Sequence, residues 1–186
     1  MRLPAPRIAP LGDAELSPEA REVLAALPEY ARGFNIFRTQ AHNPDALGAF
    51  LAWGNYVLSE RNSLTARQRE LAILRVGFLC RAGYEWAQHV VIGRQAGISE
   101  AEIAAIKQGP DAPGWDPLEA AILRACDELV GNHHVTDATW AALAPLGDTG
   151  RVDLVYTAGQ YTQVSMLLNS CGVQLDPILT ADPDLG

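Results

Sequence analysis

Apolar residues recur along this chain at three- and four-residue spacing, between recognisable helix start and stop signals. After Asn43-Pro44, the apolar positions are Leu47, Phe50, Leu51, Trp53, Val57 and Leu58. This spacing places them on one face of a helix. Similar patterns predict helices over about 17–27, from 65 toward 83, and over 84–96, 99–108, 116–131, 136–143 and 148–172. No useful stretch alternates with the period of a strand, so the pattern predicts an all-α bundle.

The helix that follows Thr65 differs from the others. Thr65 and Gln68 form a capping-box pattern at its start. Apolar residues then occupy more than one side of it, which predicts burial nearly all round. Residues 109–116 read as a loop, and the tail after Gly172 is expected to be extended.

The chain has 186 residues, which fits one domain over 1–186, with a core over about 43–172 and extended N- and C-terminal arms. Its net charge of −8 argues against a nucleic-acid partner. No apolar run reaches the roughly 18–20 residues that span a membrane, and no signal peptide is recognisable. We therefore expect a cytoplasmic protein without a membrane partner.

Most residues capable of chemistry lie between positions 61 and 89. The charges from 61 to 81 are Arg61, Arg67, Arg69, Arg75 and Arg81 against Glu70 alone. One interpretation is an electropositive site for a carboxylate substrate, in which Arg75, placed between apolar neighbours, binds the carboxylate. The other is a solvated helix face with an Arg–Glu pair.

Glu85 and His89 are four residues apart and share one helix face. A carboxylate so placed can fix the tautomer of the histidine, and burial and charge together predict a pKa near neutrality, suited to acid–base catalysis. The alternative is an ordinary ion pair on a helix surface. We predict no metal, because a catalytic site normally needs three protein ligands. Tyr84 and Trp86 flank Glu85 and could line a substrate pocket.

Cys80 has no C-x-x-C partner. At the start of a helix, the helix dipole and Arg81 would favour its thiolate and a redox role. In the middle of a helix, it would be a packed core residue.

The segment E-L-A-I-L-R-V-G-F-L-C-R-A-G-Y-E-W-A-Q-H-V-V-I-G-R-Q-A-G-I-S, residues 70–99, resembles the carboxymuconolactone decarboxylase family. The same superfamily includes the AhpD alkylhydroperoxidases. The resemblance implies an all-helical AhpD-like bundle that assembles into homo-oligomers, commonly trimers or hexamers.

AhpD proteins carry the pattern E-x11-C-x2-C-x3-H. On this chain, the glutamate and histidine of the pattern fall on Glu70 and His89, whereas the two cysteines fall on Ala82 and Glu85. A dithiol cycle requires a second thiol. The resemblance therefore implies a non-redox, acid–base branch. No organic cofactor is expected, because the sequence has no glycine-rich phosphate-binding motif.

Helix geometry limits where the chain can turn between Glu70 and His89. If two antiparallel helices met at Gly83, these residues would be offset by about 10 Å along the helix axis, at 1.5 Å per residue. A shared site requires the first helix to end near Cys80, or a neighbouring subunit to contribute.

Our leading hypothesis is an enzyme acting on a small carboxylated molecule of lactone or enol type. His89 would shuttle a proton, Glu85 or Glu70 would orient it, and Arg75 would bind the carboxylate. Two alternatives remain: a thiol peroxidase that uses Cys80, and a non-catalytic helical binding protein in which the Glu85–His89 pair only stabilises a helix.

Overall fold

The computed structural model describes residues 2–185 as a helical protein, and no strand occurs in that range. The α-helices are α1 (Pro18–Ala25), α2 (Asn35–Gln40), α3 (Pro44–Val57), α4 (Ala66–Leu79), α5 (Gly83–Gln95), α6 (Glu100–Gln108), α7 (Pro117–Asn132), α8 (Asp137–Ala142) and α9 (Gly147–Cys171). Single 3₁₀ turns occur at Asp13–Glu15, Glu29–Ala31, Ala144–Leu146 and Pro183–Leu185. The all-α prediction is confirmed, and α2 is the one α-helix that the apolar pattern did not indicate.

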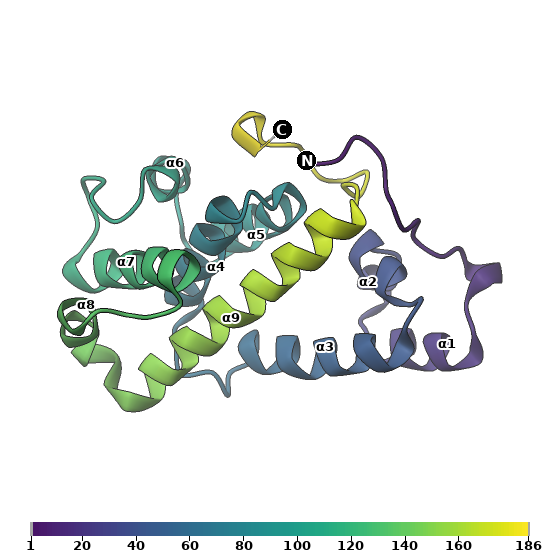
Figure 1. Cartoon of the computed structure of the whole chain (residues 1–186), viewed down its shortest axis with the longest axis horizontal. Helices are drawn as coiled ribbons and strands as arrows, with labels where there is room; N and C mark the ends of the chain where they lie inside the picture. Colours follow the sequence, from purple (N-terminus) through teal and green to yellow (C-terminus); the bar gives the residue numbers. More distant parts are fainter. Residues whose placement is uncertain (1, 186) are drawn as a thin grey trace.

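Helix α9 runs diagonally through the molecule, with α7 and α8 on one side of it and α1, α2 and α3 on the other (Figure 1). Helix α4 packs against α5, α7 and α9. Every residue of α4 from Glu70 to Gly77 is buried, as the capping-box helix was predicted to be. A glutamate in this helix therefore has to find its partners inside the protein. Within residues 2–185, none of the helices has the length and apolar character needed to cross a membrane.

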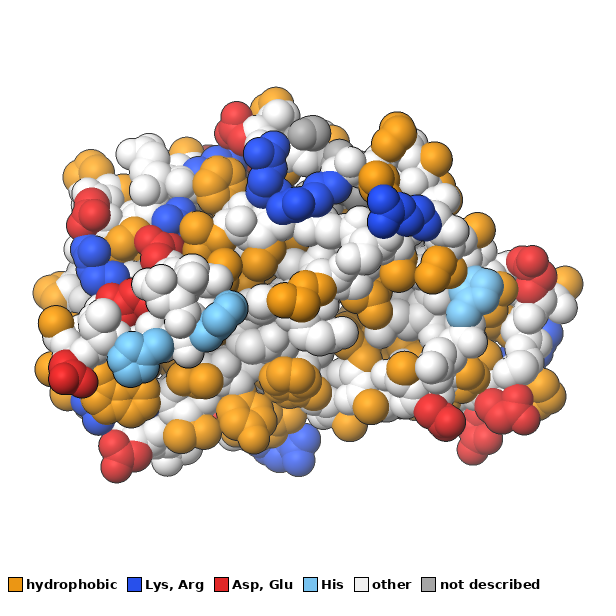
Figure 2. All heavy atoms as spheres, viewed as in Figure 1, with side chains coloured by type: hydrophobic (Ala, Val, Ile, Leu, Met, Phe, Trp, Pro, Cys, Tyr) orange, Lys and Arg blue, Asp and Glu red, His pale blue; other side chains and the backbone are white. Residues whose placement is uncertain are grey.

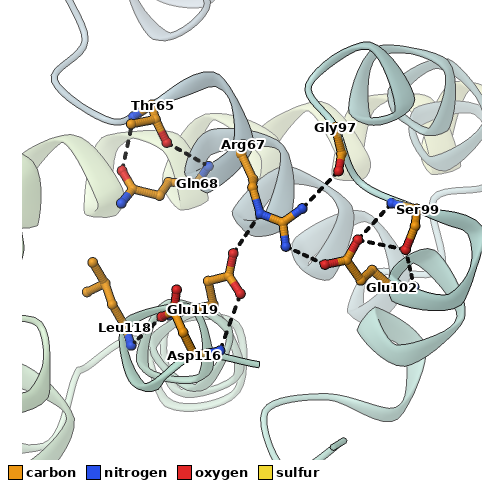
Figure 3. Close-up of polar contacts among 9 residues, drawn as sticks. All are labelled: Thr65, Arg67, Gln68, Gly97, Ser99, Glu102, Asp116, Leu118 and Glu119. Carbon is orange, nitrogen blue, oxygen red and sulfur yellow. Dashed lines mark hydrogen bonds and ion pairs between the residues drawn. The ribbon is translucent and has the colours of Figure 1, made fainter. Parts of the chain in front are cut away.

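Arg67, near the start of α4, links three helices (Figure 3). Its guanidinium contacts Glu119 of α7 at 2.6 Å and Glu102 of α6 at 2.5 Å, and it donates to the carbonyl oxygen of Gly97 at 3.0 Å. The hydrogen bonds from Arg67 and Ser99 hold the pKa of Glu102 at about 2. This arginine joins α4, α6 and α7. Its partners lie outside the stretch 61–81, whereas the expected pairing was with a glutamate of that stretch.

The turn between α4 and α5 is short. Helix α4 ends at Leu79, α5 begins at Gly83, and Arg81 between them adopts a left-handed conformation with φ of 52°. With the turn centred on Arg81, Glu70 and His89 are about 4–5 Å out of level at 1.5 Å per residue. The early end that a shared site requires is therefore present.

The two segments outside the predicted core are joined to each other and to α5 by hydrogen bonds. The chain around Asn35 is fastened to the C-terminal tail, because Asp176 accepts a hydrogen bond from the Asn35 backbone N–H at 2.9 Å. Asp176 also accepts hydrogen bonds from Tyr84 at 2.5 Å and from Gln88 at 3.1 Å. One buried carboxylate thus joins α2, α5 and the tail.

Hydrophobic side chains gather over α9 and α3 in the centre of one face, where charged side chains are few (Figure 2). On α9, the large exposed ones are Val152, Val155, Tyr156 and Met166. At 3.6 residues per turn, these four positions lie on one side of the helix, which we call the apolar face of α9.

Candidate active site

His89 lies between two carboxylates in the interior of the protein. Its Nδ1 is 2.7 Å from Oε2 of Glu70 on α4, and its Nε2 is 2.9 Å from Oε1 of Glu85 on α5. The exposed fractions of Glu70, Glu85 and His89 are 1%, 3% and 5%. The structure therefore brings together the three residues selected from the sequence, and the Glu85–His89 pair is not an ordinary surface ion pair.

The two carboxylates determine the protonation state of the imidazole. Burial lowers the pKa of His89, but the negative charges of Glu70 and Glu85 outweigh burial and raise this pKa from 6.5 to about 10. The prediction of a pKa near neutrality is wrong, because it assumed that the effect of burial would cancel the effect of the carboxylates. At neutral pH the ring is an imidazolium that can donate one N–H toward each carboxylate.

Tyr161 of α9 is a further member of this group, which the sequence did not single out. Its ring stands edge-on to the His89 ring, with centroids 4.9 Å apart and an interplanar angle of 87°. Burial, together with Glu85 and Glu70, raises the pKa of the Tyr161 hydroxyl well above its usual value. Tyr161 therefore stays neutral and packs against the imidazolium.

A pocket of about 640 Å³ opens beside His89. Glu85 and His89 line it, whereas Glu70 lies behind His89 and does not. The other polar lining residues are Asn55, Tyr84, Gln88, Gln95, Gln160 and Tyr161, and the remaining lining residues are apolar or aromatic, apart from Gly54. Among the described residues, no lysine or arginine lines this pocket.

The two arms supply much of the pocket wall. From the N-terminal side come Leu27, Pro28, Tyr30, Ala31, Phe34, Ile36 and Phe37, and from the C-terminal tail come Ile178 and Leu179. Tyr30 and Ile178 are 76% and 77% exposed, so two large apolar side chains stand in solvent at its edge. Both segments lie outside the predicted core of residues 43–172, and no site residue was predicted in either of them.

Arg75 does not lie in the pocket. Its guanidinium contacts both carboxylate oxygens of Asp127, at 2.6 and 3.0 Å, and donates to the carbonyl oxygens of Ile106 and Lys107 at 2.7 and 3.0 Å. The prediction that Arg75 binds a substrate carboxylate is therefore corrected. This side chain is fully used in joining α4, α6 and α7.

The two aromatic neighbours of Glu85 have different surroundings. Tyr84 lines the pocket, as predicted. Trp86 is not a lining residue: its ring packs against Phe78 at 5.6 Å, and Lys107 Nζ lies 5.4 Å from the ring centroid. The prediction that Trp86 binds substrate is corrected, because successive residues of a helix face different directions.

Cys80 is the C-cap residue that follows α4, and it does not line the pocket. It packs against the hydrophobic cluster around α4, α7 and α9, and burial raises the pKa of its thiol. A raised pKa disfavours the thiolate that redox chemistry needs. Cys80 therefore has the environment of a packed cysteine.

A metal site is not formed by the described side chains, since no group of three or more His, Cys, Asp and Glu residues is arranged to hold an ion.

The family match covers the segment that carries the three ionisable residues of the site. Residues 44–128 match the model of the carboxymuconolactone decarboxylase family, and this range contains Glu70, Glu85 and His89. Among curated proteins, none matches the chain.

Several solved structures share the fold. An AhpD-core protein from Ralstonia eutropha, described as an uncharacterised peroxidase-related protein, is 22% identical over 91% of this chain and 93% of its own, with a TM-score of 0.76. A protein of unknown function from Agrobacterium tumefaciens, with a proposed AhpD role in antioxidant defence, is 22% identical over 80% and 97%, with a TM-score of 0.67. A cysteine-to-alanine variant of the debrominase Bmp8, in complex with 2,3,4-tribromopyrrole, is 15% identical over 91% of each chain, with a TM-score of 0.70. The chain thus shares the fold of these AhpD-like structures, and its residues 44–128 match the carboxymuconolactone decarboxylase family.

Proposed function

We propose that this protein is an enzyme that transfers protons on a small, neutral and largely apolar molecule of lactone or enol type. The observation that carries the proposal is the line Glu70–His89–Glu85, which ends at the wall of the 640 Å³ pocket. A binding protein needs no buried imidazolium between two carboxylates. Such a group is costly to bury and is typical of sites at which protons move.

The three residues have separate roles in this proposal. Glu85 accepts a proton from a carbon next to a carbonyl group, and the electron pair of the broken C–H bond moves into the carbonyl as an enolate. The His89 imidazolium, 2.9 Å from Glu85, keeps one positive charge beside the reacting groups throughout. Glu70 holds Nδ1 and so fixes the orientation of the ring. Glu85 then returns the proton to the same or another atom of the substrate.

The lining of the pocket favours a neutral substrate over the carboxylated one expected from the sequence. A carboxylate there would face Glu85 with no lysine or arginine to pair with among the described lining residues, and the His89 imidazolium is already paired with Glu70 and Glu85. Burying an unpaired charge costs several kcal/mol. Bmp8, which shares the fold, takes up 2,3,4-tribromopyrrole, a small ring, and this agrees with an apolar pocket.

Deuterium exchange tests the proposal without knowledge of the natural substrate. A panel of neutral lactones and enolisable ring ketones is incubated with the protein in D₂O, and loss of the C–H signal is followed by NMR. His89→Asn and Glu85→Gln should lower the exchange rate by about 10²–10⁴-fold, the contribution of a positioned acid–base group. Glu70→Gln should lower it less, because Glu70 only orients the ring.

Matched controls are His134→Asn and Glu60→Gln, which change the same residue types at exposed positions. Both should keep the wild-type rate. A folded His89→Asn protein that exchanges as fast as wild type would contradict the proposal. A wild-type protein that accelerates exchange in no member of the panel would favour the non-catalytic binding protein.

A further inference from the structure

Gln160 of α9 is a buried amide that has no hydrogen-bond partner among residues 2–185. Its exposed fraction is 1%, and neither Oε1 nor Nε2 has a partner within the described part of the chain. Gln160 nevertheless lines the 640 Å³ pocket, next to Tyr161, whose ring packs on His89. The mechanism above does not use this residue.

Other glutamines in the interior have partners, which makes Gln160 an exception. Gln88 lines the same pocket and donates to Tyr84 and Asp176 at 3.3 and 3.1 Å. Gln40 donates to the carbonyl oxygen of Ile36 at 3.4 Å. Roughly 90% or more of buried polar groups are paired, and an unpaired one costs about 1–3 kcal/mol. A methionine at position 160 would avoid this cost, so the amide needs another reason to be there.

The space beside the amide is kept open by a glycine of α3. A Cβ atom at Gly54 would lie 3.9 Å from Nε2 of Gln160, and Gly54 also lines the pocket. A glutamine turns its amide easily, because its last torsion angle is broad. Nε2 can therefore be directed toward a molecule bound between Gly54 and His89.

We propose that Gln160 is a positioning residue that donates a hydrogen bond from Nε2 to a carbonyl oxygen of the ligand. The ligand class is a neutral ring compound bearing a carbonyl group, held by apolar walls and oriented by this bond. Since the amide comes from α9 and Glu85 from α5, the bond fixes which carbon of the ring faces Glu85. The orienting role rests on the proposed function, but the binding role does not.

Equilibrium binding tests the inference without any turnover. Coumarin, a neutral aromatic lactone, is compared with 2H-chromene, which has the same ring framework without the carbonyl, by titration calorimetry. Wild type should bind coumarin more tightly than 2H-chromene. Gln160→Met should weaken coumarin binding by about tenfold, which is the value of one hydrogen bond to an otherwise unpaired group. The affinity for 2H-chromene should stay within about twofold of that of wild type.

The melting temperature separates positioning from structure. Because no described residue pairs with the amide, Gln160→Met should melt at or above the wild-type temperature. Gln108→Met is the matched control, since Gln108 is exposed on α6, and it should change neither affinity. As a second variant, Gly54→Ala adds a methyl group beside Nε2 at a helical position where alanine is favoured over glycine. This variant should fold, and its affinity for coumarin should fall more than its affinity for 2H-chromene.

Several results would overturn the inference. They are equal coumarin affinity in wild type and Gln160→Met, no preference of wild type for coumarin, or a lowered melting temperature with both probes weakened alike. Failure of the deuterium-exchange test alone would remove the proposed function and leave Gln160-dependent binding standing.

Discussion

Removing one carboxylate from His89 should return its titration to the neutral range. In Glu70→Gln, the side chain keeps nearly the same shape but loses the charge whose Oε2 lies 2.7 Å from Nδ1. Two unit charges about 4 Å apart interact by about 4 kcal/mol at an effective dielectric constant of 20. This corresponds to about three pKa units at 1.4 kcal/mol per unit. The pKa of His89 should fall from about 10 to roughly 7.

The same change should alter the pH dependence of stability. A folded-state pKa raised from 6.5 to about 10 means that protonation of His89 stabilises the fold. The stabilisation is fully present below pH 6.5 and is lost as the pH rises toward 10. Between these limits, the wild-type free energy of unfolding should receive a slope of about −1.4 kcal/mol per pH unit from this residue. In Glu70→Gln, that slope should end near pH 7.

Two measurements test the predicted pKa of His89 and the predicted pH dependence of stability. NMR of ¹⁵N-labelled histidine rings reports the His89 titration directly, with its signals identified by their absence in His89→Asn. Urea unfolding between pH 6.5 and 7.5 reports the slope, in a range that lies below the usual thiol pKa of about 8.5 and the usual phenol pKa of about 10. Glu60→Gln serves as the exposed control. A wild-type His89 that titrates near 6.5, or one whose pKa is the same in Glu70→Gln, would refute this account of the site.

Three further predictions concern the other residues assigned above. Cys80→Ser should retain deuterium exchange within a few-fold, and wild type should not turn over peroxide with a dithiol reductant; rapid peroxide consumption that the mutation abolishes would restore the thiol peroxidase hypothesis. Arg75→Met should lower the free energy of unfolding by about 3 kcal/mol, as measured by urea titration. This is the lower end of the range for breaking a buried ion pair, because the Asp127 side chain is 31% exposed. We also propose that the apolar face of α9 joins copies of this chain, so Val152→Glu combined with Met166→Glu should lower the mass seen by light scattering, whereas a wild-type monomer at micromolar concentration would exclude self-association through this face.

The helices were largely predictable because their signals are local. Capping residues and apolar spacing act within one or two turns, so Thr65 with Gln68 marks the start of α4 whatever surrounds it. Helix α2 was missed for the same reason: it has only six residues and no side-chain cap at its start. Its position depends on the contact with Asp176, which lies 141 residues away from Asn35. A contact between residues so far apart in sequence does not affect the local spacing of apolar residues.

The sequence by itself determined the all-α class, the helix boundaries to within a few residues, and the three ionisable residues of the site. These follow from short-range periodicity and from spacing on a single helix, together with the family resemblance. The tertiary structure alone decided how the side chains divide between pocket and core. Arg75 was assigned to the site because it lies between apolar neighbours in a basic stretch, and Trp86 because it adjoins Glu85. In the structure, α4 and α5 turn them toward Asp127 and Phe78. Tyr161 and Gln160 reach the pocket from α9, more than 70 residues beyond His89, because packing of α9 against α3 and α5 brings them there.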